Sequence, residues 1–253
     1  SPELYQSIKN GNFKGTNWLD EIRNVNAPTT NHAVNIAGGS ERSKFSMGVS
    51  YTGQEGILGK PVASNYQRFT ARINSDHVLW RNRQGLDIIS FGENMTFSTT
   101  SQSGIAEGDH YWNNIYDMLS ANPLVPVYNP SKPDEYTMYD WLKGSGIWSL
   151  NSYAGNPIYK MVNSQNGNNI SKGYALNLSA NLRVQPIKNL VWKSQFNYKM
   201  DSGTYRSYSM IYKNTEHDQK GTDAVSQSSS AGWSWSWENT INYKFNVNKH
   251  NFD

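Results

Sequence analysis

Cysteine is absent from the 253-residue chain, which excludes a disulfide-stabilised scaffold, a cysteine-ligated zinc site and thiol catalysis. Long hydrophobic runs are absent as well: no apolar stretch exceeds three residues, whereas a membrane-spanning helix needs roughly 20. Charged residues make up only 17% of the chain, with a net charge of +3 and no clustering of Lys and Arg. This composition favours neither a charge-rich disordered chain nor a nucleic-acid-binding surface.

The sequence also lacks the residue spacings that carry catalysis or cofactor binding. Its five histidines do not have metal-ligand spacing, and neither a phosphate-binding glycine loop nor a Gly-x-Ser-x-Gly elbow occurs. We therefore expect no enzyme activity, no metal site and no cofactor.

What the sequence does contain is period-2 alternation of apolar and polar residues, which is typical of β-strands with two different faces. Aromatic residues reach 13%, which a disordered chain would not carry. The pattern predicts an all-β protein with a lead-in segment (residues 1–28) that holds one short helical turn at 17–22, followed by a partial β-barrel (29–253). The predicted strands lie near residues 30–37, 43–53, 66–76, 85–98, 171–184, 190–202 and 229–246.

The predicted connections alternate between short and long, so that all tight turns would lie at one end of the sheet. Such a rhythm is typical of outer-membrane β-barrels, which have short periplasmic turns and long extracellular loops. The short turns are expected near 38–43, 77–84, 185–189 and 246–250, and the long loops at 53–65, at 99–170 and after 202.

A soluble antiparallel sheet with one face on a core would show the same alternation. The membrane interpretation is favoured by a polar face of mostly neutral residues, by aromatic residues near the strand ends, and by a chain longer than the roughly 100 residues of a small sandwich. It predicts that the apolar face contacts the lipid bilayer and that five basic residues point into the lumen: Arg72, Arg183, Lys193, Lys199 and Lys244.

Two polar residues interrupt the apolar face in this interpretation. Glu93 falls between Phe91 and Met95, and Asn239 falls between Trp237 and Ile241. Because a carboxylate in lipid is costly, either a β-bulge shifts the register or these positions lie outside the hydrocarbon.

Seven strands do not complete a membrane-spanning sheet, because open edges would leave unpaired backbone groups in lipid. The chain starts at Ser1-Pro2 without a signal peptide or an initiator Met, and residues 251–253 look like the start of another strand. We therefore expect an internal segment, about seven to eight strands, of a larger antiparallel transmembrane β-barrel with long extracellular loops.

Several blocks of sequence, spread in order along the chain, carry a family resemblance. The blocks are NWLDEIR (17–23), VNIAGGSE (34–41), YQRFTARIN (66–74), NPLVPVY (122–128) and WENTINY (237–243). In these blocks the chain resembles the SusC/RagA type of TonB-linked outer-membrane transporters.

The resemblance implies a barrel of about 22 strands with a plugged lumen, in the outer membrane of Gram-negative Bacteroidota. It further implies energy supplied by the TonB complex through an N-terminal part outside these residues, a SusD-like surface lipoprotein as partner, and import of oligosaccharides or peptides. The alternative is a non-transporting carbohydrate-binding β protein, either an adhesin or a soluble binding module.

The long loop at 99–170 is the candidate recognition region, because it is rich in Trp, Tyr, Asp and Asn. Aromatic faces stack on sugar rings while carboxylates and amides bind hydroxyls, although a loop of this length also needs residues for a small core of its own. The candidate substrate or lid contacts are Tyr111, Trp112, Asn113, Asp117, Tyr139, Asp140, Trp141 and Trp148.

Overall fold

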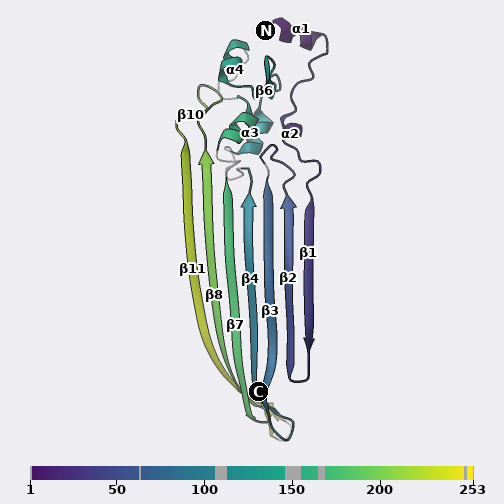
Figure 1. Ribbon diagram of the computed structural model, residues 1–253, viewed down its shortest axis with the longest axis vertical. Coiled ribbons are helices and arrows are strands. Elements are labelled where there is room, and N and C mark those ends of the chain that lie inside the picture. The colour runs from purple at the N-terminus through teal and green to yellow at the C-terminus, as the bar shows by residue number, and fades with distance from the viewer. Residues whose placement is uncertain are drawn as a thin grey trace.

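A computed structural model describes residues 2–62, 64–105, 113–145, 155–164, 169–247 and 250–252. Its main element is one seven-stranded antiparallel sheet in the order β1-β2-β3-β4-β7-β8-β11 (Figure 1). The strands are β1 (Thr29–Gly39), β2 (Ser43–Glu55), β3 (Asn65–Arg81), β4 (Asp87–Ser103), β7 (Ile170–Ile187), β8 (Leu190–Ser209) and β11 (Ala224–Tyr243).

Each strand of the main sheet pairs with the strand that follows it in the sheet, so the topology is a simple meander. The short turns β1–β2, β3–β4 and β7–β8 lie at one end of the sheet, as the sequence predicts (Figure 1). Local chemistry supports two of them. Gly85 and Asn189 have positive φ angles of 84° and 69°, and the Asn82 side chain accepts the backbone N–H groups of Gln84 and Leu86 at 2.9 Å.

Several strands are longer than hydrophobic alternation indicates. Residues 77–81, expected in a turn, continue β3, and β8 runs to Ser209 where a loop was expected after residue 202. The cause is backbone pairing, because the polar residues Ser202–Ser209 are paired one to one with Ala224–Ala231. Side-chain hydrophobicity marks only the part of each strand that has an apolar face.

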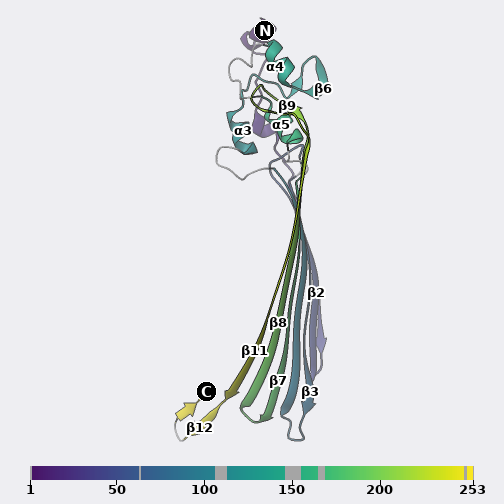
Figure 2. The same ribbon diagram turned by 90° about the vertical axis from the view of Figure 1, so that its left-hand side faces the viewer.

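The long connections fold together at the opposite end of the sheet into a region that we call the cap (Figures 1 and 2). We use this name for the described parts of residues 2–28, 56–64, 104–169 and 210–223. The elements of the cap are α1 (Pro2–Lys9), α2 (Trp18–Glu21), α3 (Asn114–Ser120), β5 (Tyr128–Asn129), β6 (Lys132–Tyr136), α4 (Tyr139–Ser145), α5 (Pro157–Asn163), β9 (Tyr212–Lys213) and β10 (Gln219–Lys220).

The buried hydrophobic cluster of the described residues lies in the cap and not on the sheet. It joins the predicted helical turn at Trp18–Glu21 to the β2–β3 loop and to the long β4–β7 connection. Its members are Trp18, Ile22, Val62, Met118, Val125, Ile158 and Met161.

At the other end of the molecule, β12 (Phe245–Val247) and β13 (His250–Phe252) form a small separate hairpin that turns away from the main sheet (Figure 2). Among the described residues, no helix combines the length and hydropathy that a membrane crossing requires.

Candidate functional site

The two faces of the sheet are chemically different, and the strand register shows how. In an antiparallel sheet, directly opposite residues project from the same face. One line of such partners crosses all seven strands and is apolar throughout: Ile36, Met47, Ile73, Met95, Leu178, Tyr198 and Trp235. The next line on the same face is also apolar: Val34, Val49, Ala71, Phe97, Leu176, Met200 and Trp233.

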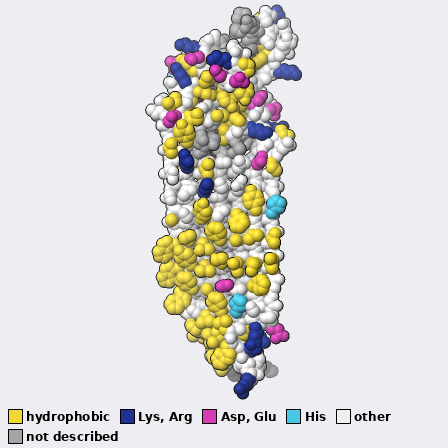
Figure 3. All heavy atoms as spheres, viewed as in Figure 1, with side chains coloured by type: hydrophobic (Ala, Val, Ile, Leu, Met, Phe, Trp, Pro, Cys, Tyr) yellow, Lys and Arg dark blue, Asp and Glu magenta, His cyan; other side chains and the backbone are white. Residues whose placement is uncertain are grey.

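These apolar side chains are not covered by another layer of the described chain. Ile36, Trp233 and Trp235 are each more than half exposed. Figure 3 shows hydrophobic side chains gathered over the part of the sheet remote from the cap. An apolar surface of this extent on a protein indicates contact with a partner or a membrane.

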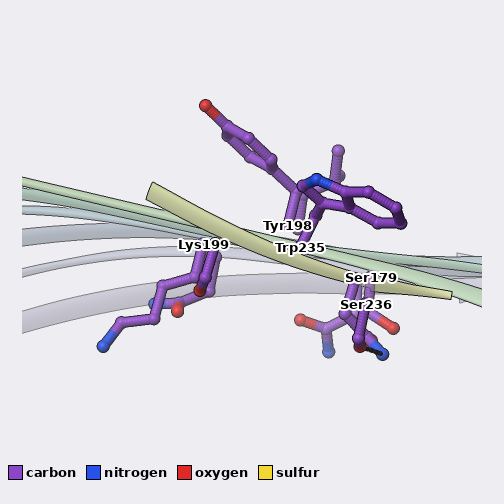
Figure 4. Close-up of a pocket in the computed structure, with 10 residues that line it drawn as sticks. Ser179, Tyr198, Lys199, Trp235 and Ser236 are labelled. Atoms are coloured by element: carbon purple, nitrogen blue, oxygen red, sulfur yellow. Dashed lines mark hydrogen bonds between the residues drawn. The ribbon is translucent and has the colours of Figure 1, made fainter. Parts of the chain in front are cut away.

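The opposite face is polar and carries the five basic residues predicted for the lumen. Arg72 and Lys199 lie on one cross-strand line with Thr96, Asn177 and Ser234 between or beside them. Arg183 is directly opposite Lys193, and Lys244 borders the same groove. Figure 4 shows the separation at the centre of the sheet, where Tyr198 and Trp235 project from one side and Lys199, Ser179 and Ser236 from the other.

A network of hydrogen bonds links neutral side chains on the polar face. The Gln195 amide donates to Ser179 Oγ at 3.3 Å and to Asn197 Oδ1 at 2.9 Å, and the Asn197 amide donates to Ser236 Oγ at 3.1 Å. These side chains leave donors and acceptors exposed, so the face can be wetted and can bind polar solutes.

The strand register also tests whether a β-bulge moves Glu93 away from the apolar face, which was one of the two alternatives that the sequence left open. The pairing of β4 with β3 and β7 is continuous through this residue, and the irregularity in β3 falls at Val78–Arg81 instead. Glu93 therefore does lie on the apolar face, without a bulge at this position. Ser75 Oγ donates to its carboxylate at 3.1 Å, and His77, which lies between Ser75 and Ser43, extends the polar chain across three strands.

Asn239 lies on the apolar face as well, because the β8–β11 pairing is continuous and sets it opposite Ser194. The indole N–H of the neighbouring Trp237 donates to Ser194 Oγ at 2.8 Å. Glu93 thus belongs to a hydrogen-bonded group, whereas Asn239 lies opposite the serine that accepts the Trp237 indole N–H.

The candidate contact residues of the long loop differ from one another in their positions and interactions within the cap. Asn113 caps α3, since its side chain accepts the Tyr116 backbone N–H at 2.8 Å. Tyr139 lies under the Lys213 ammonium, 4.0 Å from the ring centroid, and Asp140 is exposed in the first turn of α4. Trp141 belongs to α4, but its side chain lies outside the described part, as do residues Tyr111, Trp112 and Trp148 altogether.

Asp117 belongs to a charged cluster that joins three separate segments. The Lys160 ammonium of α5 lies 3.0 Å from Asp117 of α3 and 3.9 Å from Asp218 in the β9–β10 hairpin. All three side chains are at most one quarter exposed, so water screens the cluster only partly. The cluster connects the long loop to the β8–β11 connection.

Tyr212 completes this cluster from β9. Its hydroxyl donates to Asp218 Oδ1 at 2.9 Å. Burial raises the pKa of Tyr212 well above its ordinary value, and the nearby Asp218 carboxylate raises it further. The phenol therefore stays neutral and remains a hydrogen-bond donor at any physiological pH.

Four tyrosines continue from this cluster towards the surface of the cap. Tyr212 meets Tyr159 edge to face, Tyr159 lies 6.2 Å from Tyr136, and Tyr136 stacks on Tyr128 with centroids 5.1 Å apart. Tyr128 is 49% exposed, so the row ends in an accessible aromatic ring on the β5–β6 hairpin. Accessible aromatic rings of this kind can stack on the apolar face of a sugar or against a peptide side chain.

Two buried asparagines hold these pieces in place. Asn156 caps α5 by accepting the N–H groups of Ile158 and Tyr159 at 3.0 Å, and its own amide donates to the Val127 carbonyl. Its backbone N–H donates to Asn214 Oδ1 at 2.7 Å, and the Asn214 amide donates to Asp218. Sequence reasoning missed Lys160, Asn214 and Tyr212, because nothing in the spacing connects them to Asp117. The one sequence signal was Asn-Pro at 156–157, a helix-start pattern.

In the part of the chain that the structure describes, no three His, Asp or Glu side chains are grouped as metal ligands. The arrangement instead offers aromatic ring faces on the cap and a wall of amides, hydroxyls and cations on the sheet. Both are suited to binding polar solutes without covalent chemistry.

Long antiparallel strands, a predominantly apolar face, an opposite polar face and loops of unequal length define a segment of a transmembrane β-barrel wall. Comparison with solved structures agrees with this fold. The chain matches the RagAB peptide importer in its "closed-closed" state with a TM-score of 0.69 and 18% identity over 92% of its length, and in its "open-open" state with 0.69 and 19% over 93%. A further structure of the RagAB peptide transporter gives 0.68.

At the level of sequence, the chain is 28% identical over 158 residues, or 60% of its length, to the TonB-dependent receptor SusC of Bacteroides thetaiotaomicron. No protein-family model matches the chain. The chain spans 13% of the SusC length and 24% of the matched RagAB chains. The chain is thus similar to the SusC/RagA type of TonB-dependent transporters, and the predicted fold class and the predicted resemblance are confirmed.

Proposed function

We propose that the chain forms part of the barrel wall of a TonB-dependent nutrient transporter in the outer membrane. The observation that carries this proposal is the pair of apolar lines that cross all seven strands without interruption. A soluble sheet would cover such a face with a second layer, whereas a barrel wall exposes it to lipid.

The height of the apolar face supports this placement. On β4 this face extends from Ile89 to Thr99, a distance of ten residues. The cross-strand partners at the two borders are Val184 and Trp192 at one end and Phe69 and Tyr174 at the other. At about 3.4 Å per residue and a strand tilt of about 40°, ten residues rise about 26 Å, close to the roughly 25 Å apolar band of outer-membrane barrels. Aromatic residues stand at both borders, as they do in the girdles of such barrels.

In this proposal the polar face lines the lumen, the short turns face the periplasm and the cap faces the outside. Arg72, Arg183, Lys193, Lys199 and Lys244 then project into the lumen, as the sequence predicts. The lead-in segment 1–28 belongs to the cap through Trp18 and Ile22, rather than forming a separate unit.

The cap takes part in substrate capture or in docking a SusD-like surface lipoprotein. Support comes from the exposed end of the tyrosine row at Tyr128, together with Tyr139 and Asp140 on the neighbouring α4. Tyr111, Trp112, Trp141 and Trp148 remain candidate contacts. Asn113 and Asp117 contribute by fixing the shape of the cap, because a helix N-terminus and an ion pair already engage their side chains.

The transported solute is proposed to be an oligosaccharide or a peptide, taken up with energy supplied through TonB. The similarity to SusC and to the RagAB peptide importer supports this class of nutrient. A peptide and a sugar both present polar groups and apolar patches, which suit the amide-rich wall and the tyrosine rings.

Thiol labelling of whole cells tests the orientation and the membrane placement together. These 253 residues contain no cysteine, so each single substitution introduces the one thiol of this segment. Asp134→Cys on β6 and Lys188→Cys in the β7–β8 turn are a matched pair, since both positions are exposed charged residues. An impermeant maleimide should label position 134 in intact cells and position 188 only after the outer membrane is permeabilised. The reverse pattern contradicts the orientation, and equal labelling in a detergent-free soluble fraction contradicts membrane insertion.

A further inference from the structure

Towards the cap, the apolar face of the sheet changes into a polar surface that still points to the same side. The strand pairing continues without a shift past the border at Tyr174, so the next lines of opposite residues belong to this face as well. Arg206 lies on the second of these lines, opposite Gln227. The first line holds hydroxyl and amide groups around one lysine: Gln67, Ser101, Lys172, Thr204 and Ser229.

Lys172 and Arg206 are close neighbours on this polar surface. Lys172 is directly opposite Thr204, and Arg206 follows two residues later on β8, so the two cations are diagonal partners on adjacent strands. Diagonal partners in an antiparallel sheet lie about 7–8 Å apart, which long side chains can bridge. Both side chains are exposed, and within the described residues neither has an acidic partner. Figure 3 shows basic side chains on this face, between the hydrophobic area and the cap.

The height of the two cations on the sheet matches the headgroup layer of a membrane. Lys172 is two residues beyond the border at Tyr174, and Arg206 lies on the line of Ile170, four residues beyond it. At about 3.4 Å per residue and a tilt of about 40°, these steps rise about 5 Å and about 10 Å above the hydrocarbon. The headgroup layer on each side of a bilayer is roughly 5–8 Å thick, and long basic side chains bring their charge into it.

We propose that Lys172 and Arg206 bind the phosphate of a phosphorylated glycolipid in the outer leaflet, whose acyl chains lie on the adjoining apolar face. An ammonium and a planar guanidinium both form charge-assisted hydrogen bonds with phosphate oxygens. The surrounding hydroxyl and amide side chains suit the hydroxyl groups of a sugar. An amphiphile matches both parts of the surface, because the cations continue directly into the apolar face. The assignment to the outer leaflet rests on the proposed function, in which the cap faces the outside.

Titration of the purified full-length protein in neutral detergent tests the site. The probe is monophosphorylated lipid A, and its dephosphorylated form, phosphatidylglycerol and inorganic phosphate are the comparison ligands. Arg206→Gln should weaken binding of the probe about tenfold, the loss expected for one charge-assisted contact. Arg68→Gln is the matched control and should leave the affinity unchanged. Arg68 is also exposed and lies at a similar height, but on the polar face, on the line of Thr100 and Gly173.

A charge-conserving variant separates loss of a contact from loss of the fold. Lys172→Gln should weaken binding as Arg206→Gln does, whereas Lys172→Arg should retain most of the wild-type affinity. The proposal is overturned if the wild type binds both forms of lipid A equally, or if phosphatidylglycerol or inorganic phosphate binds as tightly as the probe. It is also overturned if Arg68→Gln weakens binding as much as Arg206→Gln, because the attraction would then be a property of the net charge.

Nutrient uptake by cells that carry the same variants distinguishes this inference from the proposed function. Uptake by the wild type, together with equal binding of the two forms of lipid A, refutes the lipid site alone. A preference for the phosphorylated lipid without any nutrient uptake refutes the transport proposal and leaves the lipid site standing.

Discussion

The sheet and the cap of this chain are stabilised in opposite ways. In the sheet, each strand pairs with a neighbour along nearly its whole length, while large apolar side chains such as Trp233, Trp235 and Ile241 stay exposed. In the cap, the strands and helices are short, but Ile22, Val125 and Met161 are completely buried. The sheet thus relies on backbone hydrogen bonds and on an apolar environment, whereas the cap has a small core of the kind found in water-soluble proteins.

This comparison suggests that the two regions respond independently to substitution. Packing defects in the cap should loosen the cap alone, and polar substitutions on the apolar face should affect membrane assembly alone. The following predictions test this independence, starting with the largest expected effect.

Met161→Ala should give the largest effect in the cap. Met161 is 0% exposed and belongs to α5, so its removal leaves a cavity in the hydrophobic cluster that costs roughly 2–5 kcal/mol. Hydrogen exchange should show faster exchange of the amides in α3 and α5, with unchanged protection of β3, β4 and β7. Loss of protection in the strands as well would show that cap and sheet unfold as one unit.

Leu178→Arg should have the corresponding effect on the sheet. Leu178 lies in the middle of the apolar face, on the line from Ile36 to Trp235, and an arginine at mid-membrane depth costs roughly 2–4 kcal/mol. Its neighbour Asn177 projects from the polar face, so Asn177→Arg should be tolerated. Urea titration of both variants refolded into lipid vesicles measures the difference, and equal losses at the two positions would refute the assignment of faces.

The contrast between the regions also shows what sequence reasoning could reach. The alternating residues from Tyr174 to Val184 predict both the strand and its faces, because each residue's environment depends only on its parity. The placement of Arg72 and Lys199 on one face follows in the same way. The polar extension of β8 beyond residue 202 was not predictable, since only its partner strand specifies it.

The candidate site in the cap was predicted less completely, for a physical reason. Asp117, Lys160 and Asp218 come from three segments that have no common period, and their contact depends on how the loops fold over Trp18 and Ile22. Composition correctly marked the long loop as rich in aromatic and acidic residues. It could not distinguish Asp117, which is engaged in an ion pair, from the exposed Asp140.

Tyr212→Phe should have a smaller effect, limited to the cap and dependent on pH. At neutral pH, loss of the hydrogen bond to Asp218 should cost about 1 kcal/mol. The pKa of Tyr212 is raised in the folded cap above its ordinary value of about 10. When the pH rises above about 10, Tyr212 therefore loses its proton in the unfolded chain but keeps it in the folded cap. The wild-type cap should therefore lose stability as the pH rises above about 10.

Thermal melts of the cap, followed by tyrosine fluorescence between neutral and alkaline pH, measure this dependence. Tyr212→Phe should show a smaller decline above pH 10 than the wild type. Tyr128→Phe is the matched control, because Tyr128 lies at the exposed end of the tyrosine row. An identical alkaline decline in all three proteins would show that Tyr212 is not the group responsible.

Asn113→Ala should give the smallest of these effects and the most local one. The Asn113 side chain accepts a hydrogen bond from the Tyr116 backbone N–H at the start of α3. Loss of a helix N-capping side chain lowers the free energy of unfolding by about 1 kcal/mol. Asn113→Asp should restore most of the stability, because an aspartate accepts the same hydrogen bond and its charge suits a helix N-terminus. Hydrogen exchange at Tyr116 and Asp117 directly measures the stability of the N-terminus of α3. A titration with the transported solute or with the lipoprotein measures binding. If Asn113 acts only through α3, the aspartate variant should bind as the wild type does. If binding stays weak in Asn113→Asp while exchange at Tyr116 is restored, then the Asn113 amide itself contacts the ligand, as the sequence originally suggested.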